Sequence, residues 1–386
     1  MTRKHLFGIP ILSTSLLLVL TFSLPAFADH IHHLYYNNSI WQDQDLTTLT
    51  GGGIATSFGG IAAFYTTPNN QLHVYYVDST YNHVHELYFN NTSWSDSDLT
   101  AMTSGLAASP YGLSGFAIGN LQHVFYYGSD SQVHQLYYNN ASWVDQNISG
   151  LAGGPLAGAG PIVAFATTPN DQFHVYYEPL ANLDLHQLYF NGTSWSDSDL
   201  TSITGTYCYT DWMAGFAVGN FQDVLCPGVG SNGFLNMQDI YYNNITWLDQ
   251  DVTTKVGGLP LYLGGGVAAF QVPGARRGEV YGVTSDTHIH QFDFIGGRWD
   301  DTDLTGAYGA PADGAFGGIV AFATTPNDQY HIYYAPSTEV YQIYYTGSSW
   351  SVEDLTGGAG QADDNSGMAG FSIGNLQHVF YMSSGN

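Results

Sequence analysis

Hydrophobic and polar positions alternate along most of the chain in short stretches that are typical of β-strands. Residues 83–100, HVHELYFNNTSWSDSDLT, begin with a run rich in β-branched and aromatic side chains. The cluster at 90–93 predicts a turn, because asparagine tolerates positive φ and bonds its own backbone. Trp94 opens a second short strand, which we expect to close at residues 98–100. This stretch therefore reads as two strands joined by a turn.

The same eighteen-residue unit occurs seven times without a gap, always with tryptophan at its twelfth position. The copies are residues 30–47, 83–100, 132–149, 184–201, 236–253, 288–305 and 339–356, and their tryptophans are Trp41, Trp94, Trp143, Trp195, Trp247, Trp299 and Trp350. The tryptophans are 53, 49, 52, 52, 52 and 51 residues apart. Self-similarity with a period of roughly 50 residues indicates a solenoid, a propeller or an array.

A second strand–turn–strand pattern lies between these units and comes in two forms. One form has a Thr-Thr-Pro-Asn turn, at residues 59–77, 160–177 and 317–334. The other has a Gly-Asn turn, at residues 114–127, 214–225 and 369–381, and a divergent seventh copy is residues 265–283. Both turns are good strand breakers. The two forms mostly alternate, which suggests that a double unit was duplicated.

Each repeat thus holds four short strands, and no helical periodicity longer than a turn follows residue 28. Four strands in a unit of this length are typical of a propeller blade. The repeats begin at residue 30 with the second half of a unit and end at residue 381 with the first half of one. We therefore expect an all-β chain, a seven-bladed β-propeller of four antiparallel strands per blade. Its last blade is built from both termini, and residues 29–386 form a single domain.

Residues 1–28 differ from the rest. A basic start is followed by an apolar run and by Ala26-Phe27-Ala28, a small-residue cleavage site. This is the pattern of a secretory signal peptide, so we expect a secreted protein, extracellular or periplasmic. An uncleaved membrane anchor is the alternative.

Charge narrows the choice of partners. The chain has 6 Lys and Arg against 32 Asp and Glu. Such a surface repels phosphate backbones and anionic lipid heads, so we expect no nucleic-acid partner and no membrane binding. We expect a monomer. Cys208 and Cys226 are the two cysteines, and in an oxidising compartment a disulfide between them is the natural interpretation, with two separate buried thiols as the alternative.

Polar residues recur at fixed strand positions, where they need partners or solvent. The first column precedes a Val-Tyr or Val-Phe in most copies: His73, His123, His174, Asp223, Glu279, His331 and His378. The second column lies one strand later: His32, His85, His134, His186, Gln238, His290 and Tyr341, each followed by His33, Glu86, Gln135, Gln187, Asp239, Gln291 or Gln342. The length of the hairpin loop decides whether His123 shares a face with His134 or with Gln135. The sequence leaves this open.

Residues 122–139, QHVFYYGSDSQVHQLYYN, with Trp143 after them, resemble the blade unit of the fungal-type fucose-specific lectins. The Val-His-Glu of residues 84–86 and the Val-His-Gln of residues 133–135 fit the second half of that unit. The resemblance implies a propeller that binds sugars in clefts between adjacent blades, with an arginine, a glutamate and an aromatic ring. The arginine position is arginine in none of the seven copies, the glutamate position is Glu only at Glu86, and that family has six blades. The resemblance therefore implies a carbohydrate-binding propeller but does not identify the sugar.

Carried over residue by residue, the resemblance pairs the first column with the residue after the second. The sugar-binding pairs would be His73 with Glu86, His123 with Gln135, His174 with Gln187, and His331 with Gln342. An aromatic ring such as Trp94 or Trp143 would stack on the sugar or, alternatively, anchor its blade. Blade four, with Asp223, Gln238 and Asp239, is the poorest candidate. A propeller that binds proteins or serves a structural role is the other function that we consider.

We expect neither catalysis, nor a cofactor, nor a metal. Catalysis needs one asymmetric site, whereas these polar positions repeat, and no G-x-S-x-G or H-E-x-x-H string occurs. The Asp-x-Asp pairs lack the further acidic ligand that calcium would need. Zinc usually takes three or four ligands, which pairs of histidines in different blades do not provide.

Overall fold

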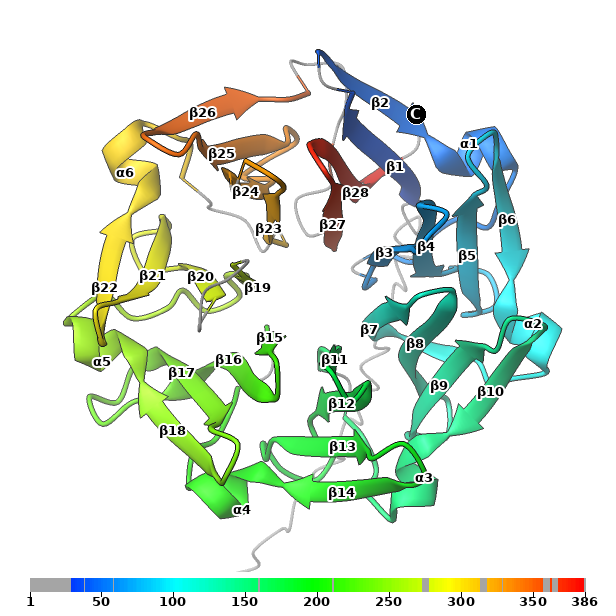
Figure 1. Ribbon diagram of the computed structural model, residues 1–386, viewed down its shortest axis with the longest axis horizontal. Helices are drawn as coiled ribbons and strands as arrows, with labels where there is room; N and C mark the ends of the chain where they lie inside the picture. The colour runs from blue at the N-terminus through cyan, green and yellow to red at the C-terminus, as the bar shows by residue number, and fades with distance from the viewer. Residues whose placement is uncertain are drawn as a thin grey trace, which may run out of the picture.

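The structure is a computed structural model that describes residues 29–384, apart from 38, 58, 159, 210–211, 273–277, 313–317, 328, 357–361 and 363–366. Seven four-stranded antiparallel sheets stand as blades around a central axis (Figure 1). The seven-bladed all-β propeller predicted from the repeats is confirmed. The expected signal peptide, residues 1–28, lies outside the described residues. Among the helices of the described part, none is long and apolar enough to cross a membrane.

Blades 1 to 3 run in chain order from the inner strand to the outer strand. Blade 1 is β3 (Ala62–Thr66), β4 (Gln71–Val77), β5 (Val84–Phe89) and β6 (Trp94–Asp98). Blade 2 is β7 (Ala108–Ile118), β8 (Leu121–Gly128), β9 (Val133–Tyr138) and β10 (Trp143–Asn147). Blade 3 is β11 (Val163–Thr167), β12 (Gln172–Tyr177), β13 (His186–Phe190) and β14 (Trp195–Asp199).

Blades 4 to 6 repeat this order. Blade 4 is β15 (Ala214–Val218), β16 (Phe221–Val229), β17 (Leu235–Tyr242) and β18 (Trp247–Asp251). Blade 5 is β19 (Val267–Gln271), β20 (Gly278–Val283), β21 (Ile289–Ile295) and β22 (Arg298–Asp303). Blade 6 is β23 (Val320–Thr324), β24 (Gln329–Tyr334), β25 (Tyr341–Tyr345) and β26 (Trp350–Asp354).

Blade 7 joins the two ends of the chain. It contains β27 (Met368–Ile373), β28 (Leu376–Ser384), β1 (Asp29–Tyr36) and β2 (Trp41–Asp45), in the sheet order β2-β1-β28-β27. The join is the antiparallel pairing of β1 with β28, in which Leu34 lies opposite Val379. The predicted closure of the ring by two half-blades is confirmed, and it removes the free strand edges of an open array.

In the described part of the chain, a one-turn helix follows the outer strand of six of the blades. These helices are α1 (Leu46–Thr50), α2 (Leu99–Thr103), α3 (Ile148–Ala152), α4 (Leu200–Thr204), α5 (Val252–Val256) and α6 (Leu304–Tyr308). We expected residues 98–100 to end a strand, but Asp98 caps α2, and its side chain accepts a hydrogen bond from the Ala101 amide at 2.8 Å. Five residues are too few for a helical hydrophobic period, so only the cap residue marked these helices in the sequence.

The hydrophobic core lies mainly between adjacent blades. One cluster, for example, joins Val77 and Val84 of blade 1 to Leu113 and Val124 of blade 2. Each blade therefore depends on its neighbours for burial, as expected for a repeat architecture. Cys208 and Cys226 form a disulfide with Cα atoms 5.6 Å apart, which ties the segment after α4 to β16.

Candidate functional site

The register of β8 and β9 settles which polar column faces which. His123 lies opposite Tyr137, and Phe125 lies opposite Gln135. Alternate residues of a strand share a face, so His123 and Gln135 lie on the same face of blade 2. Gln135 Nε2 donates to His123 Nδ1 at 2.8 Å. His134 lies on the other face, where it bonds Asp145.

All four predicted pairs come together as buried side chains. The hydrogen bonds are His73 Nδ1 to Glu86 Oε1 at 2.8 Å, Gln135 Nε2 to His123 Nδ1 at 2.8 Å, Gln187 Nε2 to His174 Nδ1 at 2.9 Å, and Gln342 Nε2 to His331 Nδ1 at 2.6 Å. Burial lowers the pKa of the histidine to about 4 in three of these pairs and also at His378: His123, His174, His331 and His378. These four rings are neutral near pH 7, so they act as hydrogen-bond partners rather than as cations.

Two of these pairs open onto clefts whose opposite wall belongs to the next blade. The cleft between blades 2 and 3 (cleft 2/3) encloses 620 Å³ and brings His123 and Gln135 to face Trp195. The cleft between blades 3 and 4 (cleft 3/4) encloses 530 Å³ and brings His174 and Gln187 to face Trp247. The tryptophan of a cleft therefore comes from the repeat after the one that supplies the polar pair.

This offset places the two tryptophans that we singled out from the sequence. Trp94 lines a cleft of 580 Å³ between blades 7 and 1 (cleft 7/1), together with His33 and His378. Trp143 reaches back toward blade 1, where its ring lies edge-on to Tyr75 with the centroids 6.1 Å apart. Both rings stand at the boundary between their own blade and the preceding one, and Trp94 lines the cleft there.

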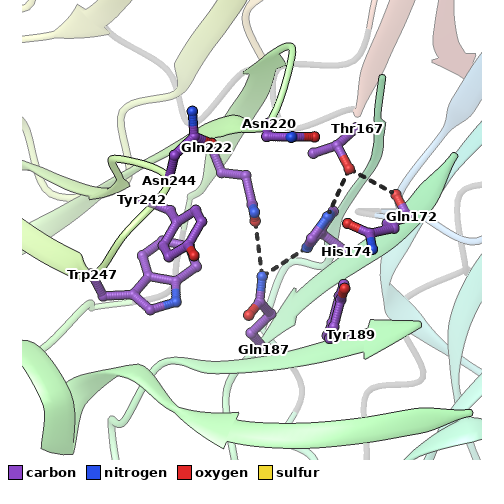
Figure 2. Close-up of a pocket in the computed structure, with 10 residues that line it drawn as sticks. All are labelled: Thr167, Gln172, His174, Gln187, Tyr189, Asn220, Gln222, Tyr242, Asn244 and Trp247. Atoms are coloured by element: carbon purple, nitrogen blue, oxygen red, sulfur yellow. Dashed lines mark hydrogen bonds between the residues drawn. The ribbon is translucent and has the colours of Figure 1, made fainter. Parts of the chain in front are cut away.

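Blade 3 shows a polar network at the base of its cleft (Figure 2). Gln187 Nε2 lies 2.9 Å from His174 Nδ1, 3.0 Å from the Tyr176 hydroxyl and 2.9 Å from Oε1 of Gln222, which belongs to blade 4. Tyr176 donates to the same Gln222 oxygen at 2.5 Å. Since His174 Nδ1 accepts from Gln187, its proton is on Nε2, which lies 3.2 Å from Thr167 Oγ1. Every polar atom of the His174 ring thus has a partner.

The same network occurs in the other two blades with a Thr-Thr-Pro-Asn turn, which we call the threonine form. In blade 1 it consists of Thr66, His73, Tyr75, Glu86 and, from blade 2, Gln122. In blade 6 it consists of Thr324, His331, Tyr333, Gln342 and, from blade 7, Gln377. The glutamine always comes from a following blade with a Gly-Asn turn, which we call the glycine form.

Two of the glycine-form blades, 2 and 7, build a different and more apolar cleft. In blade 2, Ile118 stands where blade 3 has Thr167, and Phe125 stands where it has Tyr176. Phe173 of blade 3 takes the place of the cross-blade glutamine, with its ring centroid 4.5 Å from that of His123. His123 Nε2 is consequently buried without a hydrogen bond, as is His378 Nε2 in blade 7.

Sequence reasoning missed the threonine, the tyrosine and the cross-blade glutamine of the polar network. Their signal was present in the alternation of the two forms. The threonine-form turn brings Thr66, Thr167 and Thr324, and the glycine-form turn is followed by Gln122, Gln222 and Gln377 one residue before the first polar column. We expected blade 4 to be a poor binder, yet Asp223 and Glu279 line a cleft of 500 Å³ between blades 4 and 5. Burial raises the pKa of Glu279 there to about 7.

Comparison with known proteins supports the fold. No family model matches the sequence, and no curated protein matches it significantly. The BP39L lectin from Burkholderia pseudomallei has a similar structure, with a TM-score of 0.60 at 16% identity over 85% of this chain and 97% of that one. A lectin from Aleuria aurantia, described as a six-bladed β-propeller with a novel mode of fucose recognition, gives a TM-score of 0.52 at 14% identity over 78% of this chain and 96% of that one.

A third solved structure, AofleA from Arthrobotrys oligospora, gives a TM-score of 0.51 at 12% identity over 92% of this chain and 94% of its own. The resemblance to fucose-binding propeller lectins that the blade unit indicated is therefore confirmed at the level of the fold, with seven blades here.

Proposed function

We propose that this chain is a secreted protein that binds neutral sugars in the clefts between its blades and does not transform them. The observation that carries the proposal is the composition of cleft 2/3. On one wall lie the hydrogen-bonded pair His123 and Gln135, and on the other lie Phe190 and Trp195. A sugar presents hydroxyl groups along its edge and an apolar face of C–H groups, and these two walls complement those two sides.

The absence of charge in this cleft favours a neutral ligand. None of the described residues that line it is Asp, Glu, Lys or Arg. Burial holds the pKa of His123 at about 4, so the imidazole is uncharged near pH 7. Gln135 and the neighbouring Asn139 are amides, which donate and accept hydrogen bonds without charge. An acidic sugar or a phosphate ester would find no cationic partner here.

The chain has several clefts of this kind, which suits multivalent binding. Clefts 2/3, 3/4 and 7/1 each place a histidine beside a tryptophan of the next blade. Several weak sites on one rigid body raise the avidity for a surface that displays many copies of one glycan. Several of the solved structures with a similar fold are lectins by name, and two structures of the Aleuria aurantia lectin are complexes with fucosides. L-Fucose is therefore the first sugar to test.

The deciding experiment is a glycan array with residues 29–386, followed by calorimetric titration with the best monosaccharide. We expect saturable binding to a defined set of sugars. Trp195→Ala and Gln135→Ala should each weaken binding in cleft 2/3 by tenfold or more, which corresponds to about 1.4 kcal/mol. Ile203→Ala, on the exposed surface of α4, is the control and should leave binding unchanged.

A folded protein that binds nothing on the array would overturn the proposal. A protein-binding propeller would then be the better description. If sugar binds, but both cleft variants bind it as tightly as wild type does, cleft 2/3 is not the site. The clefts of the threonine-form blades, such as cleft 3/4, would then be tested next.

A further inference from the structure

The outer corner of blade 5 gathers four metal-ligating side chains. Asp286 lies in the turn after β20, His288 directly precedes β21, His290 lies in β21, and Asp303 ends β22. His290 Nε2 is 3.4 Å from Asp286 Oδ2. His288 Nδ1 is 2.9 Å from Asp303 Oδ2 and 3.6 Å from Asp286 Oδ2. Asp286, His290 and Asp303 each place one ligand atom within 4.8 Å of the other two, and His288 adjoins both carboxylates.

Three of these separations lie near those of a tetrahedral zinc site. Zinc binds nitrogen and oxygen ligands at about 2.0–2.1 Å, which places the ligand atoms of a tetrahedron roughly 3.3 Å apart. The three contacts measure 2.9, 3.4 and 3.6 Å, and Asp286, His290 and Asp303 have ligand atoms within 4.8 Å of one another. Binding of an ion would draw these ligand atoms together, and His288 would have to turn toward His290 to complete a set of four.

His290 is held in the orientation that a metal ligand requires. Only 5% of this residue is exposed, and its Nδ1 lies 2.7 Å from Asp301 Oδ1. A carboxylate that accepts the proton of one ring nitrogen fixes the tautomer and leaves the other nitrogen free to bind a metal, an arrangement found for most metal-bound histidines. Asp301 thus aims Nε2 into the corner.

Blade 5 has a glycine where other blades place a hydroxyl beside the corresponding aspartate. A Cβ at Gly306 would lie 2.2 Å from Asp303 Oδ2 and 3.1 Å from His288 Nδ1, so both groups pack directly against the glycine. At the same place in blades 7, 3 and 4, the hydroxyls of Thr48, Ser202 and Thr254 donate to the oxygen that corresponds to Asp303 Oδ2, at 2.5, 2.6 and 2.7 Å. In blade 5 residue 306 supplies no hydroxyl to compete with a metal ion for Asp303 Oδ2.

The charge of the corner also suits a cation. Asp286, Asp301 and Asp303 form ion pairs with histidines and, within the described part of the chain, with no lysine or arginine. We propose that Asp286, His288, His290 and Asp303 bind a divalent transition-metal ion, with zinc as the best fit to two imidazoles and two carboxylates. From the sequence we expected no zinc site, because pairs of histidines in different blades do not provide enough ligands. These four side chains belong to one blade.

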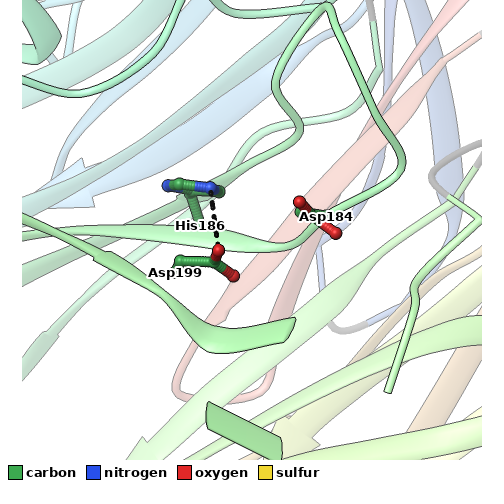
Figure 3. A group of neighbouring side chains, drawn as sticks. All are labelled: Asp184, His186 and Asp199. Atoms are coloured by element: carbon green, nitrogen blue, oxygen red, sulfur yellow. Dashed lines mark ion pairs between the residues drawn. The ribbon is translucent and has the colours of Figure 1, made fainter. Parts of the chain in front are cut away.

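Blade 3 carries a less complete version of this corner, which serves as an internal comparison (Figure 3). Asp184, His186 and Asp199 have ligand atoms within 4.8 Å of one another. His186 Nε2 is 4.0 Å from Asp199 Oδ2, which also accepts the Ser202 hydroxyl. This group has one histidine, and the Ser202 hydroxyl already bonds its Asp199 carboxylate, so it should bind zinc more weakly than the blade 5 corner.

The test is calorimetric titration of zinc chloride into untagged residues 29–386 that have been stripped with a chelator, without sugar. One site should bind much more tightly than any other. Cobalt(II), titrated in the same way, should show the intense visible bands of tetrahedral coordination. His288→Asn with His290→Gln gives blade 5 the side chains that blade 4 has at Asn236 and Gln238, so this double variant should fold and lose the tight site, with affinity at least a hundredfold lower.

Two further variants make the assignment specific. Gly306→Thr copies Thr48 of blade 7 and should weaken zinc binding at least tenfold, because the added side chain would displace Asp303 and its hydroxyl would compete for Oδ2. His30→Asn with His32→Gln removes a matched pair of histidines in blade 7 and should leave the tight site intact. The inference fails if wild type binds no zinc tightly, or if the blade 7 variant loses the site and the blade 5 variant keeps it. Because no sugar is present, these outcomes do not depend on the proposed function.

Discussion

Thr167 Oγ1 lies 3.2 Å from Nε2 of the buried His174. In blade 2 the same position is Ile118, and Nε2 of His123 is buried without a hydrogen bond. Together with Phe125 in place of Tyr176 and Phe173 in place of the cross-blade glutamine, this exchange separates two kinds of cleft in one ring. In the first kind the polar base is fully hydrogen-bonded by the protein itself, and in the second an apolar wall replaces part of it.

The first prediction concerns Thr167. Thr167→Val keeps the shape of the side chain but leaves the Nε2–H of His174 buried and unpaired, which costs about 1–3 kcal/mol. The free energy of unfolding, measured in denaturant, should fall by that amount. Ile118→Val is the matched control in blade 2, where no hydrogen bond is lost, and should cost less than about 1 kcal/mol. Equal losses in the two variants would show that the threonine contact is not what stabilises His174.

A second prediction tests the link between blades 3 and 4. The Tyr176 hydroxyl and Gln187 Nε2 both bond Gln222 Oε1 across the cleft. In a double-mutant cycle of Tyr176→Phe and Gln222→Leu, the double variant should be more stable than the sum of the single effects predicts, with a coupling of about 1 kcal/mol. Strictly additive losses would mean that the two side chains do not stabilise each other.

The third prediction concerns pH. Burial lowers the pKa of His123 to about 4, from about 6.5 in an unfolded chain. Below pH 6.5 the unfolded state therefore binds more protons than the folded state. The stability that comes from the neutral ring is complete above pH 6.5 and is lost as pH falls toward 4. His123→Gln should lose about 2–3 kcal/mol less than wild type between pH 7 and pH 4.

His186 supplies the contrast for this pH experiment. Burial acts to lower its pKa, but the hydrogen bond and the charge of Asp197 outweigh burial and leave the pKa raised. Its contribution is therefore present below pH 6.5 and is lost as pH rises through the folded-state pKa. His186→Gln should change the stability profile only above pH 6, on the opposite side from His123→Gln. A common pH range for both variants would contradict the opposite directions of the two pKa shifts, lowered for His123 and raised for His186.

A fourth prediction concerns the disulfide. Cys208 and Cys226 are 18 residues apart, and a loop of that size in the unfolded chain accounts for about 3 kcal/mol. Cys208→Ser with Cys226→Ser should lower the free energy of unfolding by about that amount. Sugar affinity in cleft 2/3 should not change, because neither cysteine lines it. A large loss of binding would show that the segment after α4 positions the cleft.

The fold could be derived from the sequence because the blade unit is repeated seven times along the chain. The recurrence of tryptophan every 49–53 residues, from Trp41 to Trp350, specified the repeat, and the two half-units at the ends specified closure. The pairing of His123 with Gln135 could not be derived, since a change of one residue in the hairpin loop reverses the face. Only the register of β8 with β9 decided it.

The sequence also did not reveal that a tryptophan faces the polar pair of the preceding blade. Trp195 follows Gln187 closely in the chain, yet it faces Gln135 of the preceding blade. The sequence contains no information on which side of a blade a side chain projects until the twist and packing of the sheets are known. The zinc-like corner was overlooked for a related reason: Gly306 is informative only once its neighbours Asp303 and His288 are placed in space.

The odd number of blades has a consequence of its own. A pattern of two alternating forms can run around a ring without a fault only when the number of members is even. With seven blades one junction must break the alternation, and here blade 5 stands between a glycine-form blade 4 and a threonine-form blade 6. The polar network of the threonine form needs Gln122, Gln222 or Gln377 from its neighbour, but blade 5 offers Gly278 to blade 4 and receives Tyr330 from blade 6. Blade 5 therefore lies outside the pairing that links the other six blades, and it is the blade in which Glu279 replaces histidine and Gly306 packs against Asp303 and His288.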